Sequence, residues 1–206
     1  MSASGLQRIL TAALCSLPLL LSQVCWPAAN NDQVLTAILL LADTEVSDPD
    51  FADAAVLVMN NLGPAPIGII INRPTAVPVS QLFPELKRLA NLPDKVYFGG
   101  PIESDSVWFL FRTTSTPPRA AIKILDGVCL SADKPLLLKL LRRDQPLDGL
   151  RLFIGHAGWA PGQLEEEIAS GAWKLEHARP ESIFKGQEEH PWPSDPATRP
   201  LPKHNT

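Results

Sequence analysis

Short runs of apolar residues, separated by turn residues, follow one another from residue 35 to residue 177. Their length and their content of Val, Ile and aromatic residues are typical of β-strands. They predict strands at 35–41, 54–60, 66–72, 96–99, 106–112, 120–125, 151–157 and 172–177. Gly63 and Pro64, which separate the second run from the third, indicate a hairpin between those two strands.

Three further stretches have the pattern of helices: 80–91, 133–143 and 161–171. Ser80 and Asp133 stand where an N-cap is expected, because their side chains can accept a hydrogen bond from the first turn. Pro161 fits the first turn of the third helix, and Gly171 fits its end. Mostly consecutive strands with three to four helices predict an α+β fold, in one domain over residues 30–185.

The first 29 residues differ from the rest of the chain. Arg8 is their only charged residue, an apolar run follows at 9–21, and small residues precede position 30. This order predicts a signal peptide that is cleaved after Ala28 or Ala29, with the protein in the periplasm or secreted. Two alternatives stay open: an uncleaved leader that anchors the chain to the membrane, or a true start near Val34 and a cytoplasmic protein.

Composition narrows the choice of partner. The net charge is −4, so the chain lacks the surplus of Lys and Arg with which proteins neutralise nucleic-acid phosphates. Residues 186–206 are rich in proline and poor in aliphatic residues, which predicts a disordered tail. The remaining partners are a small molecule or another protein, and the sequence identifies neither of them, nor the oligomeric state.

Three motifs interrupt the apolar strands with residues that suit a turn or a binding loop. NRP ends the run that begins IGIII, GGP follows VYF, and GHAGWAPGQLEEEI occupies residues 155–168. Turn chemistry at a strand end is the simplest interpretation of each motif. Loops at strand ends also commonly carry binding residues. The candidate binding residues are Asn72, Arg73, Gly99, Gly100, Trp159 and Gln163.

Candidate catalytic groups are few. His156 is the best single candidate for proton transfer, because a histidine ordinarily titrates near neutral pH. Glu165 and Cys129 are its candidate partners in a hydrolase-type site, although a lone cysteine between apolar neighbours is typical of a core residue. The His and Cys spacings match no metal site, and no nucleotide-binding glycine fingerprint is present. The sequence therefore predicts no metal and no cofactor.

Taken in order, IGIIINRP, VYFGGPIESDSVWFLFR and RLFIGHAGWAPGQLEEEIASGAWKLEH resemble the AlgH/YqgE family of bacterial proteins. The resemblance extends from about residue 35 to residue 184. It implies a single α+β domain whose branched, mostly antiparallel sheet curls into a partial barrel. It implies no catalytic residue, cofactor or agreed substrate. Relatives usually carry tyrosine at position 156, which argues against a shared catalytic role for His156. Relatives also generally lack a leader and are cytoplasmic, which is a second difference from this chain.

Two hypotheses about function follow, and a third depends on the leader. The first is a non-enzymatic, exported domain that binds a small ligand or a protein partner through the residues of the three motifs. The second is a hydrolase-type enzyme that uses His156 with Glu165 or Cys129. The third is a cytoplasmic regulatory protein, which requires the chain to start near Val34 and to have no leader.

Overall fold

Ten strands form one sheet in the computed structural model, which describes residues 37–43, 50–60 and 62–184. The strands are β1 (Ile38–Ala42), β2 (Ala55–Met59), β3 (Ile67–Ile70), β4 (Pro74–Pro78), β5 (Lys95–Phe98), β6 (Ile102–Arg112), β7 (Ile122–Leu125), β8 (Val128–Ser131), β9 (Leu150–Gly158) and β10 (Trp173–His177). Their main order is β10-β1-β2-β3-β9-β6-β8-β7, and β4 and β5 form a branch that joins β9. β2 and β3 form the predicted hairpin.

The sheet branches at β9. One edge of β9 pairs with β6 in antiparallel orientation. The other edge is divided, because Phe153 and Ile154 pair with β5 in parallel orientation, whereas Ala157 and Gly158 pair with β3 in antiparallel orientation. All the other pairings are antiparallel within the described part of the chain. The sheet curls into a half-barrel, so the predicted α+β fold with a branched, mostly antiparallel sheet is confirmed.

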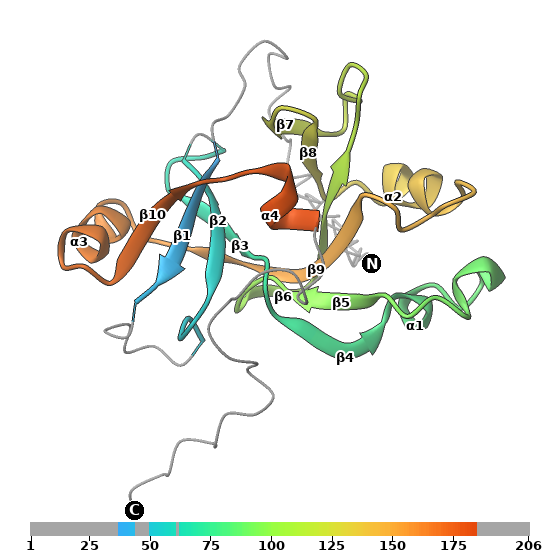
Figure 1. Ribbon diagram of the computed structural model, residues 1–206, viewed down its shortest axis with the longest axis horizontal. Helices are drawn as coiled ribbons and strands as arrows, with labels where there is room; N and C mark the ends of the chain where they lie inside the picture. The colour runs from blue at the N-terminus through green and yellow to red at the C-terminus, as the bar shows by residue number, and fades with distance from the viewer. Residues whose placement is uncertain (1–36, 44–49, 61, 185–206) are drawn as a thin grey trace, which may run out of the picture.

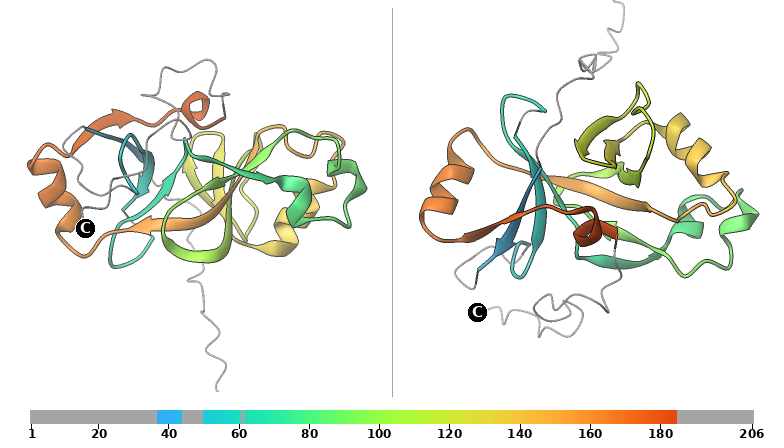
Figure 2. Two further views of the ribbon diagram at one scale, coloured as in Figure 1. Left: turned by 90° about the horizontal axis from the view of Figure 1, so that it is seen from below. Right: turned by 45° about the horizontal axis from the view of Figure 1, so that its top comes forward.

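The helices lie at the ends of the sheet and across its opening. They are α1 (Val79–Leu82), the 3-10 helix η1 (Lys87–Leu89), α2 (Lys134–Leu141), α3 (Gln163–Ala169) and α4 (Pro180–Phe184). Figure 1 shows α3 at one end of the molecule and α1 and α2 at the other, with β9 running between them. The two further views in Figure 2 show the same separation of α3 from α2. β9 therefore connects the two ends of the molecule.

The central strands are buried on both faces, which explains why their sequences are continuous apolar runs. All five residues of β2 are buried. Val56 and Val58 pack in the cluster that contains Trp159 and Trp173. Leu57, on the opposite face of β2, belongs to the cluster that also contains residues of α4 and β6. α2 covers a third cluster, which includes alternate residues of β6 and β9.

The predicted helix over 80–91 is wrong, because Pro84 divides it. A residue that precedes proline avoids helical backbone angles, and Phe83 is not helical, with φ −134° and ψ 62°. α1 therefore stops at Leu82, and only the short η1 follows. The sequence also failed to predict β4 and β8. β4 begins and ends with a proline, and a sheet tolerates proline in an edge strand because proline cannot donate a backbone hydrogen bond.

The other helix ends agree with the sequence patterns, with one shift. Asp133 caps α2, because its side chain accepts a hydrogen bond from the Leu136 amide at 2.7 Å. Gly171 ends the α3 segment with a positive φ of 85°. α3 begins at Gln163, so Pro161 lies in the preceding turn rather than in the first turn of the helix.

The predicted leader at 1–29 and the predicted tail at 186–206 lie outside the described residues. Within the described residues, no helix has the length and hydrophobicity needed to cross a membrane.

Candidate functional site

Asn72 and Arg73 hold the turn that precedes β2. The buried Asn72 side chain accepts a hydrogen bond from the Ala55 amide and donates one to the Asp53 carbonyl, both at 2.9 Å. Arg73 Nη2 donates to the Ala52 carbonyl at 2.9 Å. Asp53 has a positive φ of 55°, which costs energy in a residue other than glycine. The two side chains therefore stabilise a strained turn from within the same chain.

Gly99 and Gly100 cross the β9 backbone at close range. A Cβ atom on Gly100 would overlap the backbone of His156, and one on Gly155 would overlap the Gly100 carbonyl. Gly155 also has a φ of 70°, a conformation that other residues rarely adopt. Gly99 and Gly100 of the second motif and Gly155 of the third thus lie on the two sides of one backbone crossing.

Trp159 and Gln163 converge on Glu167 of α3. The Glu167 carboxylate accepts hydrogen bonds from the indole nitrogens of Trp159 at 2.9 Å and Trp173 at 2.8 Å. It also accepts one from Gln163 Nε2 at 2.8 Å, while Gln163 Oε1 accepts from the Ala160 amide at 3.0 Å. This network ties the end of β9 to α3 and β10. Glu167 was not among the predicted residues, although its spacing of four from Gln163 is typical of paired side chains on one helix face.

The three motifs meet where the sheet branches. The Phe98 amide donates to the Arg73 carbonyl at 2.8 Å, and the Ile70 amide donates to the Gly99 carbonyl at 2.9 Å. The Gly99 amide in turn donates to the Ile154 carbonyl at 2.8 Å. The structure therefore brings NRP, GGP and the start of the third motif together. The contacts described above give each motif a role in building this junction.

His156 faces an acid other than the predicted one. Its Nδ1 lies 3.9 Å from Glu103 Oε2. Glu103, with a positive φ of 50°, lies where the β6 register shifts opposite β9. His156 is 8% exposed, and its ring packs on Trp108, with ring centroids 5.3 Å apart. Burial lowers the pKa of His156, and the Glu103 charge opposes that shift.

The lowered pKa of His156 predicts a stability that falls in mild acid. The unfolded chain binds a proton near pH 6.5, whereas the folded protein resists protonation until a lower pH. Stability is therefore full above about pH 6.5 and decreases as the pH falls toward the folded pKa. Urea unfolding of the native and His156→Gln proteins at about pH 7.5 and about pH 5.5 measures this. The native protein should lose more stability than the variant, and equal losses would contradict the prediction.

Cys129 is not placed to act with His156. Cys129 is fully buried in β8, and burial raises the pKa of its thiol to about 11, so it stays protonated at neutral pH. Its register partner Phe111 pairs on the other side with Leu150, at the opposite end of β9 from His156. The stretch from Leu150 to His156 spans roughly 20 Å of extended strand. A Cys–His pair needs hydrogen-bond contact, which this separation excludes.

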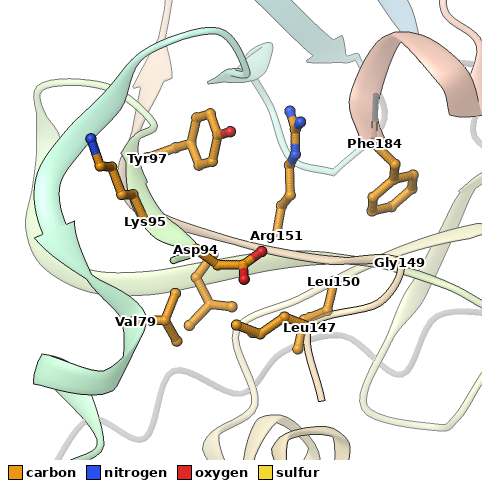
Figure 3. A pocket seen from close by; sticks show the side chains of 10 residues that line it. Val79, Asp94, Lys95, Tyr97, Leu147, Gly149, Leu150, Arg151 and Phe184 are labelled. Carbon is orange, nitrogen blue, oxygen red and sulfur yellow. The ribbon is translucent and has the colours of Figure 1, made fainter. Parts of the chain in front are cut away.

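A cavity of about 230 Å³ lies between β5, β9 and α4, away from the predicted residues. Figure 3 shows Arg151 of β9 rising beside it, with Tyr97 on one side and Phe184 on the other. The lining residues are Val79, Asp94, Lys95, Tyr97, Leu147, Gly149, Leu150, Arg151, Leu152 and Phe184. Its lining combines apolar side chains with charged groups of both signs.

Arg151 is the most deeply placed charge of this cavity. Its guanidinium lies 4.8 Å from the centroid of the Tyr97 ring, within the range of a cation–π contact. Burial lowers the pKa of Arg151, and Tyr97 and Asp94 oppose that shift through their charges. The signal in the sequence was the single arginine near the start of this mostly apolar strand.

A wider cavity of about 500 Å³ adjoins the first, and Gly149 lines both. The two arginines that line it contact other parts of the protein. Arg143 Nη2 donates to the carbonyls of Pro146 and Asp148, both at 3.2 Å, and Arg112 stacks on the Phe184 ring at 5.0 Å. No group of three or more His, Cys, Asp or Glu side chains in the described parts of the chain could hold a metal ion.

Curated proteins of similar sequence are known from several bacteria. A UPF0301 protein of Streptomyces avermitilis is 34% identical over 172 residues, which cover 77% of this chain and 83% of that protein. A UPF0301 protein of Anaeromyxobacter sp. is 32% identical over 164 residues, which cover 74% of this chain and 82% of that protein.

Two solved structures share the fold. The crystal structure of protein DIP2367 from Corynebacterium diphtheriae matches with a TM-score of 0.61 and 26% identity, over 79% of this chain and 86% of that one. The solution structure of the AlgH protein from Pseudomonas aeruginosa matches with a TM-score of 0.58 and 23% identity, over 76% and 84%. The AlgH-like family model, DUF179, matches residues 39–196. The chain therefore belongs to the AlgH-like family.

Proposed function

We propose that the protein is a non-catalytic binding domain, which takes a small molecule with an anionic group into the cavity beside Arg151. One observation carries this proposal: a largely buried guanidinium on a central strand forms a wall of a cavity that also has an aromatic and an apolar lining. An arginine fork matches the oxygens of a carboxylate or phosphate. Partial burial strengthens such a contact, because water screens it less.

The size of the cavity limits the ligand. Cavities that bind drug-sized molecules measure roughly 300–1,000 Å³, so about 230 Å³ suits a smaller compound. Leu147 and Val79 offer apolar surface for the part of the molecule that is not charged. We therefore expect a metabolite-sized ligand rather than a nucleotide or a peptide.

The test is a binding screen on the whole protein with Arg151→Met as the variant. Small carboxylates, phosphate, phosphate monoesters and free amino acids are each titrated by calorimetry and by thermal shift. Arg151→Met keeps an unbranched side chain but removes the guanidinium. We expect it to weaken binding about tenfold or more, since a charge-assisted hydrogen bond is lost. Arg119→Met, at an exposed site outside the cavity lining, is the control and should bind as the native protein does. Binding unchanged in Arg151→Met, or no binding by any class of compound, would overturn the proposal.

The residues of the three motifs are a second location for a ligand, and that stays a prediction. We favour the Arg151 cavity because the contacts of Asn72, Trp159 and Gln163 already support neighbouring parts of the fold. The hydrolase alternative has less support, since Cys129 is remote from His156 and remains a thiol.

We also propose that the protein acts outside the cytoplasm, on the evidence of the leader pattern in residues 1–29. Expression of the full chain in a Gram-negative host, followed by separation of the periplasm and intact-mass measurement, tests this. The expected product is a periplasmic protein that starts at Ala29 or Asn30. A cytoplasmic protein that retains residue 1, or that starts near Val34, would contradict export and restore the hypothesis of cytoplasmic regulation.

A further inference from the structure

We infer that the ligand of the Arg151 cavity is a zwitterion of amino-acid size, whose carboxylate contacts Arg151 and whose ammonium group contacts Asp94. This inference rests on the proposed function and narrows it to one class of compound. The observation behind it is that the cavity has a cation and an anion on different structural elements, above a shared apolar floor.

The backbone that carries each of the two charges is held in place. Arg151 lies on β9, the central strand of the sheet. Asp94 lies immediately before β5, and its backbone carbonyl accepts a hydrogen bond from the Val79 amide at 2.9 Å. Because β5 and β9 are paired side by side, the carboxylate of Asp94 is close enough to oppose the downward shift in the pKa of Arg151. Figure 3 shows the Asp94 carboxylate near the foot of Arg151, with the guanidinium farther along the cavity.

This charge pattern selects against a lone cation and against a dianion. Arg151, Lys95 and Asp94 are the charged residues of the lining, so it carries one net positive charge. A lone cation is repelled by two of these three groups, and a dianion meets the Asp94 carboxylate. A molecule with one carboxylate and one ammonium group satisfies both Arg151 and Asp94. Its side chain can then cover Val79 and Leu147.

The ring of Tyr97 orients the Arg151 side chain. The Arg151 guanidinium is already stacked on this ring, which restricts its rotamers before any ligand arrives. A side chain that is fixed in advance loses less entropy on binding. The site can therefore distinguish small ligands by the placement of their charges rather than by contact area.

Calorimetry with matched compounds tests the inference. The probes are leucine and phenylalanine, each compared with the acid that lacks its amino group and the amine that lacks its carboxylate. For the native protein, we expect the amino acid to bind about tenfold more tightly than its deaminated acid, and the amine to show no binding. Asp94→Asn should remove the preference for the amino acid over the acid. Asp105→Asn, at an exposed site on β6 outside the cavity lining, is the matched control and should preserve it.

The outcomes separate this inference from the proposed function. If the deaminated acids bind as tightly as the amino acids, or if Asp94→Asn keeps the preference, the zwitterion inference is wrong. The zwitterion inference is also wrong if a carboxylate or phosphate binds in an Arg151-dependent way and neither amino acid binds. In that case the proposed function still stands. If Arg151→Met leaves every ligand unaffected, both fail. Circular dichroism of Asp94→Asn establishes that the variant is folded before either result is interpreted.

Discussion

A Gly155→Ala protein is expected to lose about 4 kcal/mol of folding free energy, enough to leave little soluble protein. Two costs add at this position. Alanine is forced to a φ of 70°, which costs roughly 1–2 kcal/mol. Its Cβ also overlaps the Gly100 carbonyl, and backbone cannot move aside as a flexible side chain can. Soluble yield and urea unfolding measure the loss.

Two other glycines separate these costs. Gly162 has a φ of 85°, and a Cβ atom added there would meet no atom within 4 Å, so Gly162→Ala should show the conformational cost alone, about 1–2 kcal/mol. Gly63 has open space and no positive φ, so Gly63→Ala should be nearly neutral. If Gly155→Ala is no more damaging than Gly162→Ala, the backbone crossing does not constrain the fold.

The strands were predictable because burial on both faces leaves a continuous apolar run. β2 and β3 follow this rule, and both were expected at nearly the observed positions. In β6 only the second half was predicted, because its first four residues, 102–105, are exposed. The helix over 80–91 failed because its apolar spacing outweighed Pro84 in the prediction, whereas in the structure the proline ends the helix. Periodicity therefore identified buried faces more reliably than it identified helix length.

The branch of the sheet and the Arg151 cavity are both formed by strands that are far apart in the sequence. The glycines of the branch indicated unusual backbone at Gly100 and Gly155, but not that each is the other's neighbour. The Arg151 cavity was out of reach for the same reason. Asp94 and Arg151 are brought together only by the parallel pairing of β5 with β9, which no local pattern encodes.

The second large effect is expected at Glu167, where alanine should cost about 3 kcal/mol of folding free energy. The carboxylate is the shared acceptor for the indole nitrogens of Trp159 and Trp173, which are 6% and 4% exposed. Its removal leaves both buried donors without their acceptor, and an unsatisfied buried donor costs roughly 1–3 kcal/mol. Urea unfolding followed by tryptophan fluorescence reports both the stability and the surroundings of these rings.

Two variants show whether the loss of stability in Glu167→Ala comes from the missing hydrogen-bond acceptor or from a change in the helix. Glu166→Ala changes an exposed neighbour in α3 and should be nearly neutral, since alanine favours helix. Glu167→Gln keeps one acceptor oxygen for the indoles but turns an amide donor toward Gln163 Nε2, so its cost should be intermediate. If Glu167→Ala were as mild as Glu166→Ala, the indoles would not depend on this carboxylate. The third motif would then owe its form to something other than this network, and a binding role for Trp159 and Gln163 would regain support.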